Sequence, residues 1–241
     1  MNNIIKKIVF MVSAVLILST SCTKKANKDS FNTLSKNEQK QNWELLFNGI
    51  DLTGWQGLNN RDFPSKSWIV TDNNLLCTGK SEGSLISKSR YSNFELKWEW
   101  KLSEPGANSG IKYFVNNETG LGIEYQMIDD NDWVTSGKMQ ANDYHTTGAV
   151  YELYAPSSTK ELKPVGEWND GKIISRDGEI EHWLNGRLIA KYNRFSNDFK
   201  EKIALSKFAK IEGFGLDKEG HILLQDHESI VYFRNIKIRR L

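Results

Sequence analysis

Hydrophobic and polar residues alternate along much of this chain. Over residues 93–103 the sequence NFELKWEWKLS places an apolar residue at every second position, with charged residues between them. Because successive side chains of an extended chain point to opposite sides, this period of two predicts a strand with one buried face. The same pattern returns over residues 111–115, after the turn-like sequence of residues 106–110. Both stretches are therefore predicted to be strands.

Turn sequences divide the rest of the chain into further short strands. Asp72-Asn73-Asn74 lies between apolar runs, and Asn185-Gly186 divides residues 178–192 into two strands, as hairpin turns do. Residues 221–241 contain two more strands on either side of Glu228-Ser229.

One stretch has a helical pattern instead. Residues 197–208 place Phe199 and Ile203 on one face of a helix, with Asn197 or Asp198 as its N-cap. A single short helix among many strands with Gly-rich turns predicts an all-β fold: a two-sheet antiparallel β-sandwich of the jelly-roll type.

Residues 122–130, GIEYQMIDD, carry polar groups where a simple core strand would have apolar ones. Ile123, Tyr125 and Met127 share one face of the extended chain, whereas Glu124 and Gln126 share the other. A carboxylate and an amide on a concave sheet face are suited to binding sugar hydroxyls. A solvated outer face would give the same pattern, so both interpretations stay open from these residues alone.

The N-terminal residues predict export. Lys6 and Lys7 precede an apolar run over residues 8–18, which is typical of a signal peptide and short for a membrane span. Residues 18–22, LSTSC, resemble a lipobox, although the leucine lies one place earlier than usual. We therefore expect a lipoprotein signal peptide over residues 1–21, with lipidation of Cys22 and a flexible tether over residues 22–41.

A single folded domain is then expected over residues 42–241. The polar residues that follow Cys22 lack an acidic run, which favours a membrane-anchored lipoprotein on the periplasmic side over one at the cell surface.

Charge and cysteine content narrow the range of partners. The formal net charge is +2, and removal of residues 1–21 with their two lysines brings it to zero. A neutral domain argues against nucleic acid as the partner.

With Cys22 lipidated, Cys77 is the second and last cysteine, so no disulfide is expected. Its apolar neighbours predict a buried side chain and no catalytic thiol.

Several motifs together resemble one family along nearly the whole chain from Trp43 to Leu241. They are, in order, residues 46–55 (LFNGIDLTGW), 108–111 (NSGI), 122–126 (GIEYQ), 166–169 (GEWN), 182–186 (HWLNG), 224–227 (LQDH) and 233–236 (FRNI). This ordered set is similar to the domain of unknown function 1080, the 3-keto-disaccharide hydrolase domain family. The resemblance implies a concanavalin-like jelly roll and a carbohydrate-active hydrolase or lyase that cleaves 3-keto-glycosides. Where that family usually has glycine after the histidine of LQDH, this chain has Glu228.

The implied chemistry begins at a sugar whose C3 is a ketone. The ketone acidifies the C2 hydrogen, so a base can remove that proton, the C1 substituent leaves by elimination, and water adds back. The base is then a histidine or Glu124, with His182 preferred over His145. His182 shares a face with Ile180 and Leu184, so a structural role for it stays open. Asp129 would orient a histidine or bind a hydroxyl.

The remaining polar motif residues are expected to bind the sugar. Gln126, Lys207 or Arg234 would polarise the ketone, and the Trp168 indole would stack on a pyranose ring. The other expected substrate-binding residues are Asn169, Gln225 and His227. A divalent metal held by histidine and carboxylate could replace the enolate donor, although no compact metal-ligand spacing is present in the sequence.

Two alternatives use the same residues. The chain could be a non-catalytic glycan-binding protein, which would bind unoxidised glycans and release no product. It could also be a conventional glycoside hydrolase with Glu124 and Asp129 as its two carboxylates. Jelly-roll glucanases commonly carry Glu-x-Asp-x-Glu on one strand, and here Gln126 occupies the middle position, which argues against that mechanism.

Overall fold

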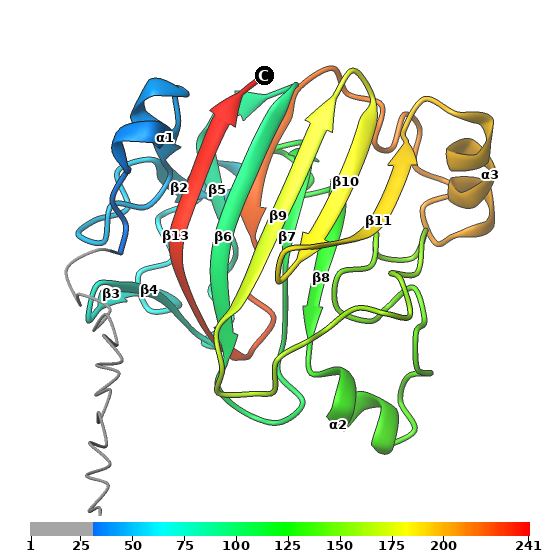
Figure 1. The fold of residues 1–241 in the computed structure, drawn as a ribbon, viewed down its shortest axis with the longest axis horizontal. Coiled ribbons are helices and arrows are strands. Elements are labelled where there is room, and N and C mark those ends of the chain that lie inside the picture. The colour runs from blue at the N-terminus through cyan, green and yellow to red at the C-terminus, as the bar shows by residue number, and fades with distance from the viewer. Residues whose placement is uncertain (1–30) are drawn as a thin grey trace, which may run out of the picture. The chain divides into compact units, whose positions relative to one another are not determined.

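The computed structural model describes residues 31–241, which form two antiparallel β-sheets packed face to face (Figure 1). The larger sheet has the strand order β11-β10-β9-β6-β13-β4-β3, and β1 also pairs with β13. The smaller sheet has the order β2-β5-β12-β7-β8. This confirms the predicted all-β sandwich.

The strands that form the larger sheet are β1 (Glu44–Leu45), β3 (Trp68–Thr71), β4 (Asn74–Thr78), β6 (Phe94–Leu102), β9 (Asn169–Arg176), β10 (Glu179–Leu184), β11 (Arg187–Asn193) and β13 (Ile230–Arg240). Those of the smaller sheet are β2 (Trp55–Gly57), β5 (Leu85–Tyr91), β7 (Asn108–Val115), β8 (Ile123–Ile128) and β12 (Gly220–Leu224). The helices are α1 (Lys36–Lys40), the single 3₁₀ turn η1 (Leu58–Asn60), α2 (Asp130–Thr135) and α3 (Asn197–Leu205).

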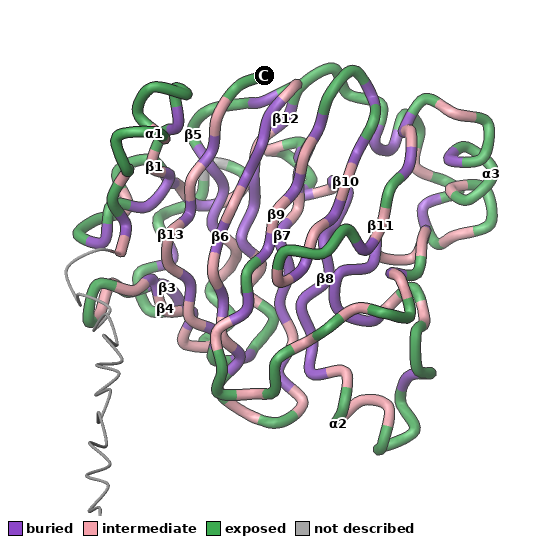
Figure 2. Tube along the Cα trace, in the orientation of Figure 1, coloured by how far each residue is buried: buried purple, intermediate pink, exposed green. Residues whose placement is uncertain are grey.

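Aromatic side chains fill the space between the sheets. Trp98 of β6 contacts Tyr125 of β8 edge to face, with ring centroids 5.0 Å apart, and so joins the two sheets. Phe94 of β6 and Tyr113 of β7 make a second such contact at 6.3 Å. In Figure 2 the buried segments follow these central strands through the interior. The alternation over residues 93–103 is thus the core face of β6.

Two local features differ from the sequence prediction. Helix α3 takes Ser196 as its N-cap, because the Ser196 hydroxyl accepts a hydrogen bond from the Phe199 N–H at 3.1 Å. Helix α2 was not predicted; it begins after Asp129, whose carboxylate accepts from the Asp132 N–H. At Glu228, where the family that the sequence resembles usually has glycine, φ is +59°, the left-handed conformation that favours glycine.

Part of the predicted tether belongs to the folded domain. Residues 31–41 include α1, which has a complete capping box between Ser35 and Glu38. Lys237 of β13 donates a hydrogen bond to Glu38 at 3.0 Å. Asn32 is buried and accepts a hydrogen bond from the Asn235 N–H at 2.7 Å. Residues 31–41, which the sequence assigned to the tether, are therefore part of the folded domain.

The predicted signal peptide, Cys22 and the first part of the tether lie outside the described residues. They stay predictions, which labelling of cells with a tagged fatty acid can test against a Cys22→Ala variant. Within residues 31–241, no helix has the length and apolar character needed to cross a membrane. Cys77 is buried as expected, and its burial raises the pKa of the thiol to about 12.

Gly171 of β9 gives a direct test of the core. A Cβ at this position would overlap the ring of Trp98, its partner in the β6–β9 register. We expect Gly171→Ala to displace Trp98 and lower the free energy of unfolding by about 2 kcal/mol, as overpacking in a close-packed core does. Thermal denaturation measures this loss. Gly54→Ala is the control, since its Cβ would have no neighbour closer than 3.8 Å. Equal melting temperatures for the two variants would contradict the packing described.

Candidate functional site

The candidate site lies on the outer face of the smaller sheet, over β7 and β8. Ile123, Tyr125 and Met127 of β8 point into the core, which leaves Glu124 and Gln126 on the opposite face, as the sequence predicted. All six residues of β8 are nevertheless buried. The outer face is therefore covered by other segments and is not a solvated surface.

Glu124 is the central charged group of this face. Only 8% of the residue is exposed, and its Oε2 lies 3.7 Å from the Nζ of Lys112, its register partner on β7. Burial raises the pKa of Glu124, while Lys112, Lys207 and His227 act in the opposite direction. The site thus contains a desolvated carboxylate faced by two lysines and a histidine from three different segments.

Gly110 makes room for this carboxylate. A Cβ on Gly110 would lie 2.6 Å from the Glu124 Oε1, which is closer than real Cβ contacts. Any side chain at this position would therefore displace the carboxylate. The glycine of the Asn-Ser-Gly-Ile motif leaves the space that the Glu124 side chain occupies. Two motifs that are separate in sequence therefore contribute to one site.

Two amide oxygens beside Glu124 lack partners. The Oδ1 of Asn108 and the Oε1 of Gln225 are buried and accept no hydrogen bond from residues 31–241. They belong to neighbouring segments, because the Gln225 N–H donates to the Gly110 carbonyl at 3.0 Å. An unpaired buried acceptor costs about 1–3 kcal/mol. Asn108 lines a cavity, so its oxygen is suited to accept a hydrogen bond from a ligand.

A cavity of about 290 Å³ adjoins this face, where Asn108 and Gln126 line it and Glu124 and Gln225 do not. It is lined by polar groups and by the rings and apolar chains that surround them: Asn108, Gln126, Ile128, Trp133, Lys138, Met139, His145, Tyr151 and His227. The mixture of planar polar groups with aromatic rings is the composition expected of a site for a small polar ligand. Three predicted site residues, Gln126, His145 and His227, therefore share one cavity.

A second polar cluster forms one wall. His145 binds two carboxylates, with its Nδ1 2.8 Å from the Asp143 Oδ1 and its Nε2 3.2 Å from the Glu152 Oε1. Glu152 also pairs with the Lys207 Nζ at 3.5 Å, and Lys207 lies over the Tyr151 ring. Glu152 has a φ of +68°, an unfavourable conformation for this residue type. The fold therefore holds the Glu152 backbone in a position from which its carboxylate contacts both His145 and Lys207.

His182 is in the protein core and not in this cavity. It is fully buried, with its Nε2 2.8 Å from the Tyr113 hydroxyl and its Nδ1 3.0 Å from the Gly148 carbonyl. Burial lowers its pKa to about 4, so the imidazole is neutral at pH 7. Its position on one face with Ile180 and Leu184 reflects core packing. This geometry fits the structural role for His182 that the sequence left open.

Four more of the predicted site residues lie elsewhere. Asp129 accepts from the Gly106 N–H at 3.0 Å and caps α2. Arg234 pairs with Glu99 at 2.6 Å and stacks on Trp168, and both residues belong to the larger sheet or its edge. Asn169 is buried and accepts from the Asn185 side chain at 2.8 Å. The structure does not bring these residues to Glu124.

Several site residues were not identified from the sequence. Asn108 and Lys112 follow the period of two on the polar face of β7, which was the available signal. Tyr151 and Glu152 lie in a long loop without periodicity, so no pattern marks them.

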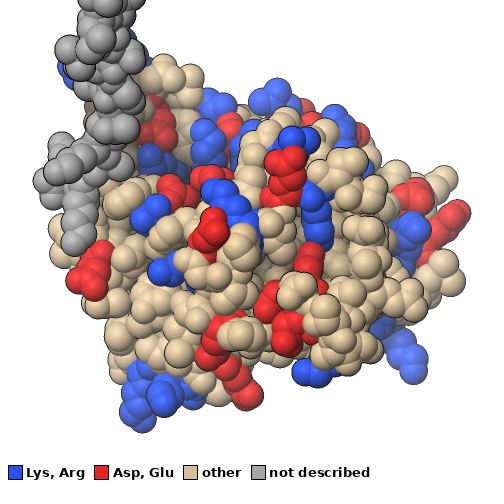
Figure 3. Space-filling view, turned by 60° about the horizontal axis from the view of Figure 1, so that its bottom comes forward, with Lys and Arg blue, Asp and Glu red and all other residues tan. Residues whose placement is uncertain are grey.

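Within residues 31–241, no three His, Cys, Asp or Glu residues gather as metal ligands do. Figure 3, which turns the lower end of the molecule forward, shows acidic and basic side chains interspersed.

The geometry can be compared with known proteins. The model of the 3-keto-alpha-glucoside-1,2-lyase-like domain matches residues 42–239. A 3-keto-disaccharide hydrolase from Bacteroides thetaiotaomicron is 29% identical, over 81% of this chain and 77% of that protein. The crystal structure of a candidate glycosyl hydrolase from Parabacteroides distasonis superposes with a TM-score of 0.78. It is 36% identical and covers 88% of this chain and 99% of its own. A second candidate glycosyl hydrolase from that organism is 25% identical, covers 78% of this chain and 99% of its own, and has a TM-score of 0.58.

The raised pKa of Glu124 predicts a measurable effect on stability. Its folded pKa lies above its unfolded value, so the folded chain binds this proton more tightly. The carboxyl therefore destabilises the fold increasingly as pH rises through the two pKa values, and has no such effect below both. We expect Glu124→Gln to be about 1 kcal/mol more stable than wild type at pH 7.5.

Urea denaturation at several pH values measures this difference, which should shrink as the pH approaches 4.5. Glu118→Gln, at an exposed position, is the control. A Glu124→Gln protein that is clearly less stable than wild type at pH 7.5 would contradict the described environment.

Proposed function

Because the chain belongs to the 3-keto-alpha-glucoside-1,2-lyase-like domain family, we propose that it cleaves the glycosidic bond of 3-keto-glycosides. In the proposed reaction a base removes the C2 proton, the C3 ketone becomes an enolate, and the C1–O bond breaks. Water then adds its oxygen to C1, and a proton returns to C2. The observation that carries this proposal is the buried Glu124 carboxylate, faced by Lys112, Lys207 and His227.

Glu124 is assigned as the base. A carboxylate with a raised pKa is a stronger base than a solvated one, provided that it stays ionised. Lys112, Lys207 and His227 favour its ionised form, and Gly110 leaves the space that it occupies. His182 does not take this role in the proposal, since it lies in the core.

The cations and amides of the site are assigned to the rest of the substrate. Lys207 lies over Tyr151 at the cavity wall and would stabilise the negative oxygen of the enolate. His227, which lines the cavity, would donate a proton to the departing C1 oxygen. The unpaired oxygen of Asn108, which lines the cavity, would accept a hydrogen bond from a sugar hydroxyl. His145, whose ring nitrogens both bind carboxylates, would position Glu152 and through it Lys207.

A conventional double-carboxylate mechanism has less support. It needs two carboxylates on either side of the glycosidic bond. Asp129, the expected second acid, caps α2 and does not line the cavity that holds Gln126 and His227. The elimination mechanism needs one base and several donors. Glu124 does not line that cavity either, but it is the carboxylate on which Lys112, Lys207 and the cavity residue His227 act.

The proposal is tested with a glucoside and its 3-keto derivative, each incubated with the purified domain and analysed by mass spectrometry. We expect cleavage of the keto-sugar alone, and a loss of roughly 10³-fold in kcat for Glu124→Gln. Glu118→Gln should retain wild-type turnover. Equal cleavage of both sugars, or full activity of Glu124→Gln, would contradict the mechanism. Binding of the unoxidised glycan without any product would favour the glycan-binding alternative.

The pH dependence tests the electrostatics of the base. Activity should fall at low pH as Glu124 is protonated. Lys112 lowers the pKa of Glu124, so Lys112→Met should raise it and move the acidic limb of kcat/KM to higher pH, by on the order of one unit. Lys97→Met, on the larger sheet, is the matched control. An acidic limb that stays in place, or moves to lower pH, would argue against Glu124 as the titrating base.

A further inference from the structure

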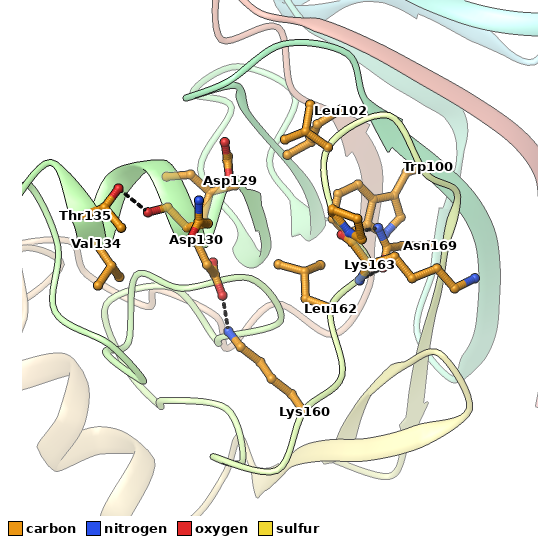
Figure 4. Close-up of a pocket in the computed structure, with 14 residues that line it drawn as sticks. Trp100, Leu102, Asp129, Asp130, Val134, Thr135, Lys160, Leu162, Lys163 and Asn169 are labelled. Carbon is orange, nitrogen blue, oxygen red and sulfur yellow. Dashed lines mark hydrogen bonds and ion pairs between the residues drawn. The ribbon is translucent and has the colours of Figure 1, made fainter.

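A second and larger cavity adjoins the candidate site. It has a volume of about 550 Å³ and lies beside α2, between the end of β8 and the start of β9 (Figure 4). Its lining is mainly apolar, with Leu102, Val134, Leu162 and Val165 among the side chains. This volume is within the range of small-molecule sites.

Its charged groups are already paired. The Asp130 Oδ2 lies 2.6 Å from the Lys160 Nζ, and the Asp130 Oδ1 accepts from the Thr147 N–H at 2.7 Å. The side chain of Lys160 is only 8% exposed and also donates to the Thr147 carbonyl at 2.8 Å. The other two charged lining residues also have partners, since Asp129 accepts from the Gly106 N–H and Lys163 donates to the Trp168 carbonyl. With two acids and two lysines, the cavity offers no net charge to bind an ion. A neutral ligand fits it better.

One polar group in the wall lacks a partner. Trp100 is fully buried, and its indole N–H donates to no group within residues 31–241. In Figure 4 the Trp100 ring forms the wall opposite α2. A buried donor without an acceptor costs free energy, and a ligand oxygen placed beside it would recover that cost. The occupant that suits this wall is an apolar body that carries an oxygen acceptor.

The position of the cavity suggests which molecule this is. Ile128 lines both this cavity and the one that contains Gln126 and His227. The two cavities also share α2, with Trp133 facing the candidate site and Val134 facing the apolar cavity. We propose that the apolar cavity binds the aromatic aglycone of the glycoside, and that an oxygen of this aglycone other than the one bonded to C1 accepts a hydrogen bond from Trp100. This inference rests on the proposed function and adds a substrate class, the aryl glycosides.

Binding is tested first, without any turnover. 2-Naphthol, a neutral aromatic alcohol, is titrated calorimetrically into the wild-type domain and two variants. Val134→Trp fills the cavity and should abolish binding, whereas Trp100→Phe keeps a ring and should weaken binding roughly threefold to tenfold by loss of one hydrogen bond. Ile69→Trp, at an exposed position on β3, is the control and should bind like wild type. An absence of binding, or binding that Val134→Trp leaves unchanged, would overturn the inference.

Turnover then distinguishes this inference from the proposed function. The aryl 3-keto-glucoside should exceed the methyl 3-keto-glucoside in kcat/KM by about tenfold or more, as expected when an apolar pocket is filled. Val134→Trp should bring the ratio near one while methyl turnover is retained. Equal kcat/KM for both sugars in wild type overturns the aglycone assignment and leaves the proposed function standing. Cleavage of neither sugar, with naphthol bound, refutes the proposed function and the aglycone role while the cavity remains a binding site.

Discussion

The two faces of β8 link the fold to the site. Tyr125 packs against Trp98 of the opposite sheet, with ring centroids 5.0 Å apart, and this contact fixes which face of β8 is turned to the core. Because side chains alternate along a strand, Glu124 and Gln126 must then point to the outer face. A shift of one residue in the pairing with β7 would place the carboxylate in the core. The hydrophobic packing between the sheets therefore determines where the charged group lies.

The surrounding segments convert that outer face into a site. Lys112 comes from the neighbouring strand, His227 from the turn after β12, and Lys207 from the segment that follows α3. Their combined effect opposes the desolvation of Glu124, so that the carboxylate is buried and still adjacent to positive charge. The same segments leave the amide oxygens of Asn108 and Gln225 without partners. The polypeptide thus gives up some stability at this face, as functional sites commonly do.

Periodicity predicted the parts of this structure that depend on a strand facing a core. The alternation of β6, the orientation of β8 and the hairpin at Asn185-Gly186 follow directly from it. It could not show which sheet a strand joins. For that reason Trp168, Asn169 and Arg234 were grouped with Glu124, although they belong to the larger sheet or its edge. Nor could it distinguish a core histidine from a catalytic one, and His182 proved to be bonded within a cluster of tyrosines.

Contacts between residues that are far apart in the sequence determine the features that periodicity did not predict. Residues 31–41 carry few large apolar groups, yet Glu38 and Asn32 bind β13 at the other end of the chain. Glu152 lies in a loop without a periodic pattern, and its role depends on contacts with His145 and Lys207, which come from different segments. Helix α2 has six residues and begins from the carboxylate of Asp129, a residue whose position at a strand end suggested catalysis instead.

The proposed cleavage depends on removal of the C2 proton, and isotope incorporation at C2 measures that step. The 3-keto-glucoside would be cleaved by the domain in D₂O, and the released 3-keto-glucose examined by NMR, with heat-inactivated protein as the control for spontaneous exchange. Elimination and rehydration predict one deuteron at C2, beyond the level of the control. Cleavage that retains the original hydrogen at C2 would contradict the account and point to direct displacement at C1.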